Sequence, residues 1–173
     1  RRGWDWALFV GGAVPALLFG VAVGNVLLGV PFYLTEDLFS VYDGSFYGKF
    51  LGLLRPFALL AGAVSLAMLL MHGAAWLSLK AEGAVAARAR RYGTVAGLVA
   101  FAGYALAGVW LGFGIDGYRI VGEVVRDGPS NPLFSEVERG GSWLAAYAER
   151  PWIVVAPVMG FLGILLAVAG LRA

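Results

Sequence analysis

The sequence predicts an all-α membrane protein, a polytopic bundle of four transmembrane helices. All 24 charged residues fall into five short segments, which leaves four charge-free stretches at residues 6–35, 56–79, 92–115 and 151–171. At a rise of about 1.5 Å per residue, each stretch is long enough to cross a hydrocarbon core about 30 Å thick. The stretches lack the polar and apolar alternation of barrel strands. In addition, 60% of the residues are hydrophobic and the mean hydropathy is +0.79.

We expect one transmembrane domain over residues 1–173, with spans at about residues 6–29, 56–79, 92–115 and 151–171. The first span holds Pro15 close to Gly11, Gly12 and Gly20, so it is the only plausible broken helix among the four. The second and fourth spans both begin with arginine, proline and an aromatic residue. Proline suits the first helical position, where its missing N–H has no intrahelical partner anyway.

The connections are an inner loop at residues 80–91 and two outer loops at residues 30–55 and 116–150. Asp43-Gly44 predicts a turn in the first outer loop, and residues 130–132 predict one in the second. An amphipathic helix on the membrane surface would suit the rest of the second outer loop, although Gly140-Gly141 weakens that interpretation.

Charge distribution predicts the orientation in the membrane, because basic residues in short loops favour the cytoplasmic side. The side with both chain ends and residues 80–91 carries seven basic and two acidic side chains, a net charge of +5. The opposite side carries six basic and nine acidic side chains, a net charge of −3. We therefore expect both ends to be cytoplasmic.

Glycines spaced four residues apart predict close helix packing, since each pair lies on one helix face and lets another backbone approach. The pairs are Gly20 with Gly24, Gly93 with Gly97, and Gly108 with Gly112. We expect these faces to pack mainly within the chain, and a partner subunit is the other candidate.

Few residues could carry chemistry. The chain has no cysteine, and we find no phosphate loop, nucleophile–base pair or metal-ligand cluster, so no catalytic residue, metal site or nucleic-acid site is predicted. His72, beside Met71 and one turn from Met68, is the haem-ligand alternative, but a neutral histidine hydrogen-bonded within the bundle is favoured. Asp116 could move protons or be an interfacial acid. Asn25 and Thr94 are expected to form interhelical hydrogen bonds.

Several short sequence words occur together in one order. They are GVPF at 29–32, LLRPFALLAG at 53–62, HGA at 72–74, LKAEG at 79–83, AGVW at 107–110, GIDGY at 114–118 and SNPL at 130–133. In this order and spacing, they closely resemble subunit II of the cytochrome bd quinol oxidases, over essentially the whole chain. The chain resembles the third to sixth of that subunit's eight helices, so we expect it to be a fragment.

The resemblance implies a heterodimeric respiratory enzyme that oxidises quinol and reduces dioxygen, in a bacterial or archaeal plasma membrane. The b and d haems would belong to subunit I, and this non-haem subunit would support assembly. Some members have a structural quinone, and a small accessory subunit and lipids are further expected partners. Two alternatives remain from the residues themselves: a secondary transporter, which would need a broken helix, and a membrane cytochrome using His72.

Overall fold

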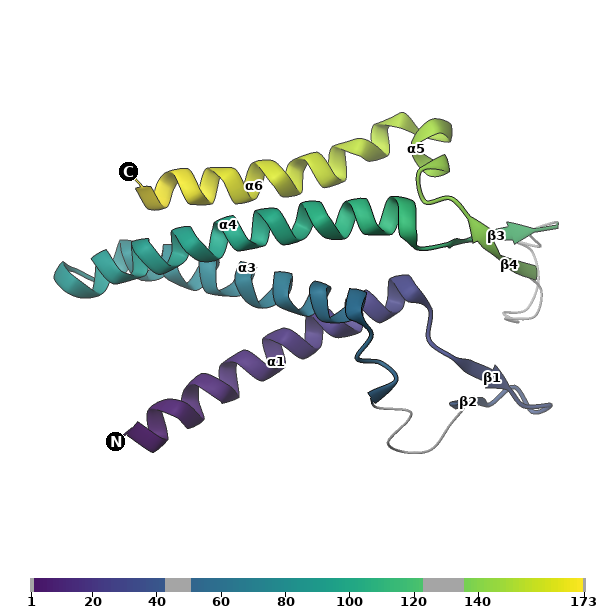
Figure 1. The fold of residues 1–173 in the computed structure, drawn as a ribbon, viewed down its shortest axis with the longest axis horizontal. Coiled ribbons are helices and arrows are strands. Elements are labelled where there is room, and N and C mark those ends of the chain that lie inside the picture. Colours follow the sequence, from purple (N-terminus) through teal and green to yellow (C-terminus); the bar gives the residue numbers. More distant parts are fainter. Residues whose placement is uncertain (1, 43–50, 123–135, 173) are drawn as a thin grey trace.

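The computed structural model describes residues 2–42, 51–122 and 136–172 (Figure 1). Four long helices dominate this part of the chain, and all are long and apolar enough to cross a membrane. They are α1 (Arg2–Leu28), α3 (Pro56–Lys80), α4 (Gly83–Gly114) and α6 (Val155–Arg172). The prediction of an all-α bundle of four membrane helices is confirmed.

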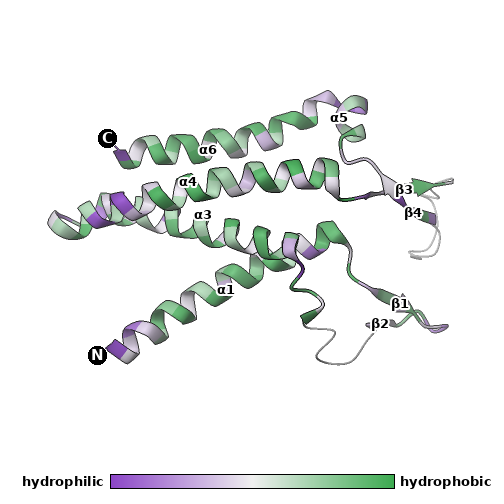
Figure 2. Ribbon diagram, in the orientation of Figure 1, coloured by the Kyte–Doolittle hydropathy of each residue, from purple (hydrophilic) through white to green (hydrophobic). Residues whose placement is uncertain are grey.

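Consecutive helices are the main packing partners: α1 packs on α3, α3 on α4, and α4 on α6. Figure 1 shows α1 and α6 at opposite edges of this arrangement. Hydrophobic residues extend along the helices, as Figure 2 shows, and only 11% to 33% of each membrane-length window is buried inside the chain. The described helices therefore present large apolar faces that other segments or lipid must cover.

Helix α4 begins well before its charge-free stretch. The predicted inner loop at residues 80–91 is largely helical, because α4 begins at Gly83 and leaves only Ala81 and Glu82 between the helices. The charges at Arg88, Arg90 and Arg91 end an apolar run without ending a helix, since alanine and arginine are both good helix formers. The prediction of a loop there was wrong for this reason.

The transporter alternative needs a broken first span, and the structure does not show one. Residues 2–28 form a single α-helix with Pro15 inside it. Proline is tolerated in membrane helices when neighbouring groups satisfy the freed backbone carbonyl. The feature that favoured a transporter is therefore absent from the described helix.

The connections at the end of the molecule away from both termini contain short antiparallel strand pairs that the sequence did not predict (Figure 1). Strands β1 (Phe32–Leu34) and β2 (Ser40–Tyr42) pair in one loop, and β3 (Gly117–Val121) and β4 (Glu136–Gly141) pair in the other. A five-residue helix α5 (Ala145–Glu149) and a 3-10 turn η2 (Pro151–Val154) lead into α6. The predicted turns at residues 43–44 and 130–132 lie outside the described residues.

The predicted surface helix is thus replaced by β4 and the short α5. In the β3–β4 register, Arg119 lies opposite Glu138 and Ile120 opposite Val137. Such cross-strand pairs of opposite charge and of apolar side chains stabilise two-stranded pairing. Gly140 has φ +124°, a value that side chains strongly disfavour, so the double glycine interrupts any helix through residues 136–141.

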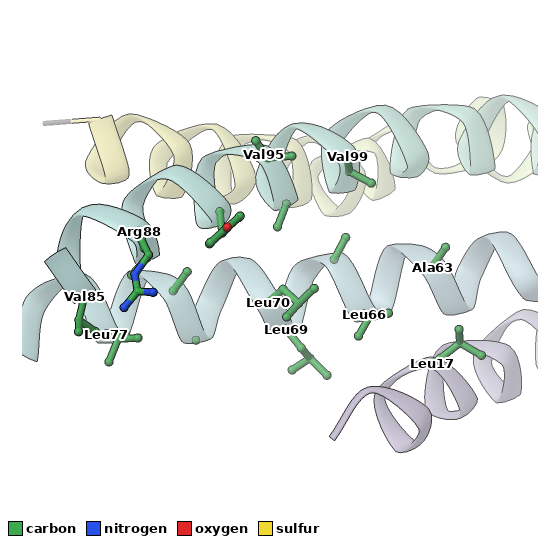
Figure 3. A pocket seen from close by; sticks show the side chains of 16 residues that line it. Leu17, Ala63, Leu66, Leu69, Leu70, Leu77, Val85, Arg88, Val95 and Val99 are labelled. Carbon is green, nitrogen blue, oxygen red and sulfur yellow. The ribbon is translucent and has the colours of Figure 1, made fainter. Parts of the chain in front are cut away.

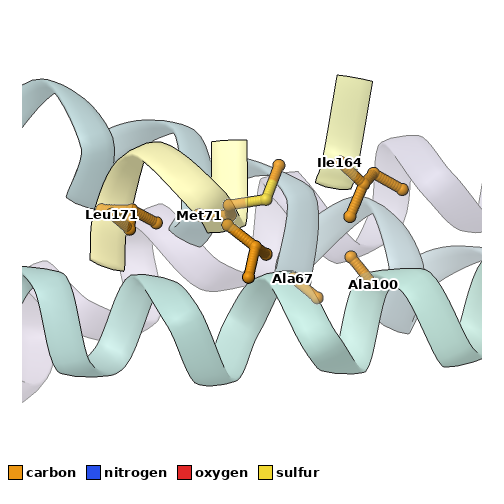
Figure 4. Close-up of a cluster of buried hydrophobic side chains, with 6 residues drawn as sticks. Ala67, Met71, Ala100, Ile164 and Leu171 are labelled. Atoms are coloured by element: carbon orange, nitrogen blue, oxygen red, sulfur yellow. The ribbon is translucent and has the colours of Figure 1, made fainter. Parts of the chain in front are cut away.

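Two buried clusters hold the helices together. One joins α3, α4 and α6 through Ala67, Met71, Ala100, Ile164, Val168 and Leu171, most of which Figure 4 labels. The other joins α1 to α3 through Val21, Leu28, Phe57 and Ala58, and partly buried side chains of α4 pack against it. Within lipid, such clusters stabilise the fold mainly by close packing, because lipid tails are as apolar as leucine.

Candidate functional site

A buried carboxamide joins the C-terminal part of α1 to the segment just before α3. Asn25 is only 4% exposed, and its Nδ2 donates hydrogen bonds to Val21 O at 2.9 Å and to Leu53 O at 2.7 Å. Its Oδ1 is buried without a partner among the described residues. The predicted interhelical hydrogen bond of Asn25 is not found, because its bonds lie within α1 and between α1 and the segment before α3.

Two further side chains reach the end of α1. The Tyr118 hydroxyl donates to Leu28 O at 3.1 Å, and Arg55 Nη1 donates to Gly29 O at 3.4 Å. These bonds satisfy carbonyls at a helix C-terminus, where no intrahelical donor is available. Gly29 has φ +74°, and the Tyr118 hydroxyl lies where a Cβ would project, so only glycine fits. We call Asn25, Gly29, Leu53, Arg55 and Tyr118 the outer junction, a name that follows the orientation predicted from the charge distribution.

Asp116 lies next to this outer junction in the chain. It follows Ile115, the C-cap of α4, and is exposed, whereas the next residue, Gly117, is buried. An exposed carboxylate at a helix end can exchange protons with water, but this position alone does not connect it to a route through the protein. Its part in proton access remains a prediction.

His72 is exposed on α3, so the interpretation of a histidine hydrogen-bonded inside the bundle was wrong. Met71 points elsewhere: it is buried, and its sulfur lies 3.0 Å from where a Cβ on Gly97 would stand. Consecutive helical residues are about 100° apart, which explains the difference. Met68 is exposed one turn from His72, so both would approach a haem iron from the same side.

The described residues therefore do not fit a haem with two axial ligands from this chain. Axial ligands must approach the iron from opposite faces, and neither methionine can do so together with His72. Among residues 2–42, 51–122 and 136–172, no group of three histidine, cysteine or acidic side chains could hold a metal ion either.

Four of the six patterned glycines lie at helix crossings. A Cβ on Gly20 would lie 2.7 Å from Gly62 Cα, and one on Gly24 would lie 2.6 Å from Ala58 Cα, both on α3. A Cβ on Gly93 would lie 2.7 Å from Ala74 Cβ, and one on Gly97 would collide with Val168 of α6. At these positions the helices approach too closely for any side chain.

The third glycine pair, Gly108 and Gly112, does not lie at a helix crossing of this kind. Gly112 faces Leu144, which would lie 3.3 Å from an added Cβ, a tight but adjustable contact. Gly108 is exposed, and nothing described lies within 4 Å of an added Cβ. The expectation that Gly108 packs within the chain was therefore wrong, because no described segment lies against this part of α4.

Other polar contacts also differ from expectation. Thr94 Oγ1 donates to Arg90 O at 2.8 Å within α4, so its hydrogen bond is not interhelical. Ser65 Oγ instead donates to Ala16 O at 2.9 Å, which links α3 to α1. Ser65 lies three residues after Gly62 and four after Ala61, so the three residues share one helix face. Small residues on such a face let a hydroxyl reach a neighbouring backbone, and this was the signal for Ser65 in the sequence.

Comparison with known proteins gives a consistent result. The family model described as cytochrome bd terminal oxidase subunit II matches residues 1–173. The chain belongs to this family. It is 43% identical over 170 residues to the probable cytochrome oxidase subunit 2 of Haemophilus influenzae, covering 98% of this chain and 44% of that protein. It is 42% identical over 173 residues to the cytochrome bd-I ubiquinol oxidase subunit 2 of Escherichia coli K12, covering 99% of this chain and 45% of that protein.

The family assignment confirms the resemblance inferred from the sequence, and the chain is a multi-pass membrane protein of the cytochrome bd subunit II family. The chain spans a little under half the length of the curated relatives it matches. The outer junction, the glycine crossings and the two buried clusters are thus features of one part of a subunit II fold.

Proposed function

We propose that this chain is part of the non-haem subunit of a bd-type quinol:oxygen oxidoreductase and supports the assembly of a haem-bearing subunit I. The observation that carries the proposal is the family match over all 173 residues. The open packing of the four helices supports it, because their large apolar faces need partners. The redox chemistry would occur on the b and d haems of subunit I.

The described residues suit a scaffold better than a redox centre. Close glycine crossings fix the helices relative to one another, and the outer junction fixes the connections at one end. Among the residues that the structure describes, His72 and the two methionines near it on α3 are not placed to ligate a haem from both faces. On this proposal the subunit contributes rigidity and surface, and electron transfer does not pass through its side chains.

The haem content of the whole complex tests whether this subunit binds no haem. We expect His72→Ala to leave all three haem absorption bands in place, because His72 stands alone on an exposed face of α3. The full-length gene product would be purified with its partner from membranes, and reduced-minus-oxidised spectra compared with wild type. Selective loss of one band with normal subunit yield would favour axial ligation by His72 instead.

Further parts of the proposal rest on the resemblance alone. They are a structural quinone bound by subunit II, a small accessory subunit, and location in a bacterial or archaeal plasma membrane; the cytoplasmic position of both ends of this segment rests instead on the charge distribution. Solvent extraction of the purified complex and counting of quinones per haem tests the first. A count no greater than the exchangeable quinone would contradict it.

A further inference from the structure

An apolar groove runs between α3 and α4 at the end of the molecule where the basic residues lie (Figure 3). Its volume is about 890 Å³, and 14 of its 16 lining residues are apolar. The exceptions are Arg88 and Tyr92 on α4, one turn apart and on the same helix face. No acidic side chain lines the groove.

The groove exists because α1 leaves α3 after their crossing. The close approach of α1 to α3 ends near Ala16, whose carbonyl oxygen accepts a hydrogen bond from Ser65. Leu17 is the only residue of α1 that lines the groove, at the end opposite Arg88 (Figure 3). Gly73 also lines the groove, and nothing described lies within 4 Å of a Cβ added there. The groove is thus an open channel along the helices.

The part of the groove between Arg88 and Val99 matches one leaflet of a bilayer. The α4 residues that line the groove run from Val85 to Val99, and Arg88 lies about 16 Å from Val99 at about 1.5 Å per residue. A hydrocarbon core is about 30 Å thick, so each leaflet contributes about 15 Å. Arg88 thus lies near the depth of the phospholipid headgroups when the apolar part lies in the acyl-chain region.

We propose that this groove binds an anionic phospholipid, with one acyl chain along α3 and α4 and its phosphate on Arg88. The Nε–H of Arg88 donates to Ala84 O at 3.3 Å, which orients the guanidinium and leaves its two terminal amino groups for phosphate oxygens. Basic pockets between membrane helices recognise acidic headgroups in this way. Tyr92 is exposed one turn further and supplies a hydroxyl donor.

The positive charge of Arg88 favours an anionic phospholipid over other occupants of the groove. A quinone has a long apolar tail but a headgroup without net charge, so it would not need Arg88. A hydrophobic helix from another protein segment would likewise leave the guanidinium unpaired in an apolar groove, which is costly. This inference concerns lipid binding alone and does not depend on the proposed oxidase function.

Photolabelling in vesicles tests the proposal. The complex that contains the full-length gene product would be reconstituted in phosphatidylcholine vesicles with a trace of phosphatidylglycerol that carries a photoreactive acyl chain. Labelled peptides would be identified by mass spectrometry. We expect labelling of residues 63–77 and 92–99, and weaker labelling when the photoreactive lipid is phosphatidylcholine.

Two variants distinguish the effect of the Arg88 charge from that of the shape of the groove. Arg88→Gln should reduce labelling by phosphatidylglycerol about fivefold, the equivalent of about 1 kcal/mol for one arginine at a lipid surface, and leave that by phosphatidylcholine unchanged. Gly73→Leu should reduce labelling by both lipids, because its side chain would occupy open space in the groove.

Matched controls are Arg91→Gln, which changes a nearby arginine that does not line the groove, and Gly163→Leu, which adds the same side chain to open space on α6. Both should label like wild type. Equal labelling in wild type and Arg88→Gln would overturn the anionic-lipid assignment. Absence of groove peptides in wild type would show that quinone or protein covers the groove, and would also overturn it.

Discussion

At the residue scale, Asn25 shows how one polar side chain can organise the end of a membrane helix. Its two donated hydrogen bonds hold Val21 O and Leu53 O, while its own carbonyl oxygen is buried without a described partner. A buried acceptor without a donor is costly, so the residue both stabilises and destabilises the junction. Asparagine was visible in the sequence as a polar residue in an apolar span, but its partner 28 residues away was not.

We expect Asn25→Leu to lower the free energy of unfolding by about 1 kcal/mol, since hydrogen bonds in membrane proteins each contribute roughly that much or less. The measurement is the midpoint of unfolding of the purified complex in increasing sodium dodecyl sulfate. Val26→Ala changes an exposed neighbour and serves as the control. A variant more stable than wild type would mean that the unpaired oxygen costs more than the two bonds contribute.

A second prediction at the residue scale concerns the role of Asp116 in proton access. Asp116→Asn keeps the size of the side chain and removes its titratable group. Because Asp116 is exposed just after the C-terminal end of α4, we expect quinol oxidase turnover, haem content and subunit yield to be unchanged. Oxygen consumption by the purified complex is the measurement. A severalfold loss of turnover with normal haem content would instead support a role in proton access.

At the element scale, the sequence predicted which segments are helices better than where they end or what joins them. Length and absence of charge are sufficient to identify a span, so all four helices were predicted. The start of α4 was missed because charge marks a membrane boundary and not a helix boundary. The strand pairs were missed because pairing such as Arg119 with Glu138 joins residues that are far apart in the sequence.

The same limit applies to the glycine faces. A four-residue spacing shows that two glycines share a helix face, but not which neighbour covers that face. Gly93 and Gly97 contact α3 and α6, whereas nothing described lies within 4 Å of a Cβ added to Gly108. Gly108 is eleven residues after Gly97 and so lies on nearly the same face of α4. The paths of the neighbouring helices, which the sequence does not give, therefore decide which part of this face is covered.

Gly97→Leu should therefore lower the yield of assembled complex severalfold without changing turnover per haem. The added side chain would collide with Val168 and hold α4 away from α6, with loss of dispersion contacts along the crossing. Gly108→Leu is the matched variant on the same helix and should fold within this chain as wild type does. Subunit yield by gel filtration and haem absorbance give both quantities, and normal yield of Gly97→Leu would contradict the packing argument.

At the scale of the whole molecule, the four helices form an open arrangement because each helix packs mainly on the helix before or after it in the chain. The buried clusters join neighbours in sequence, α1 with α3 and α3 with α4 and α6, so the two edge helices keep most of their apolar surface exposed. Large exposed residues such as Phe9 on α1 and Leu166 on α6 lie on these edges. Because the chain spans a little under half of its relatives, such surfaces are the places where the remaining helices, a partner or lipid would pack.

Orientation in the membrane is the remaining property of the whole molecule, and charge predicts it. Arg90 lies in the first turns of α4, on the side with a net charge of +5, and Glu138 lies in β4, on the side with a net charge of −3. The chain has no cysteine, so cysteines introduced singly at these exposed positions would be the only labelling sites in this segment. With an impermeant thiol reagent on intact cells, position 138 should be labelled and position 90 should be labelled only after the membrane is opened. Any other cysteines of the full-length protein would first be replaced. Labelling of position 90 and not 138 on intact cells would reverse the topology, since the positive-inside rule depends on these same short basic segments.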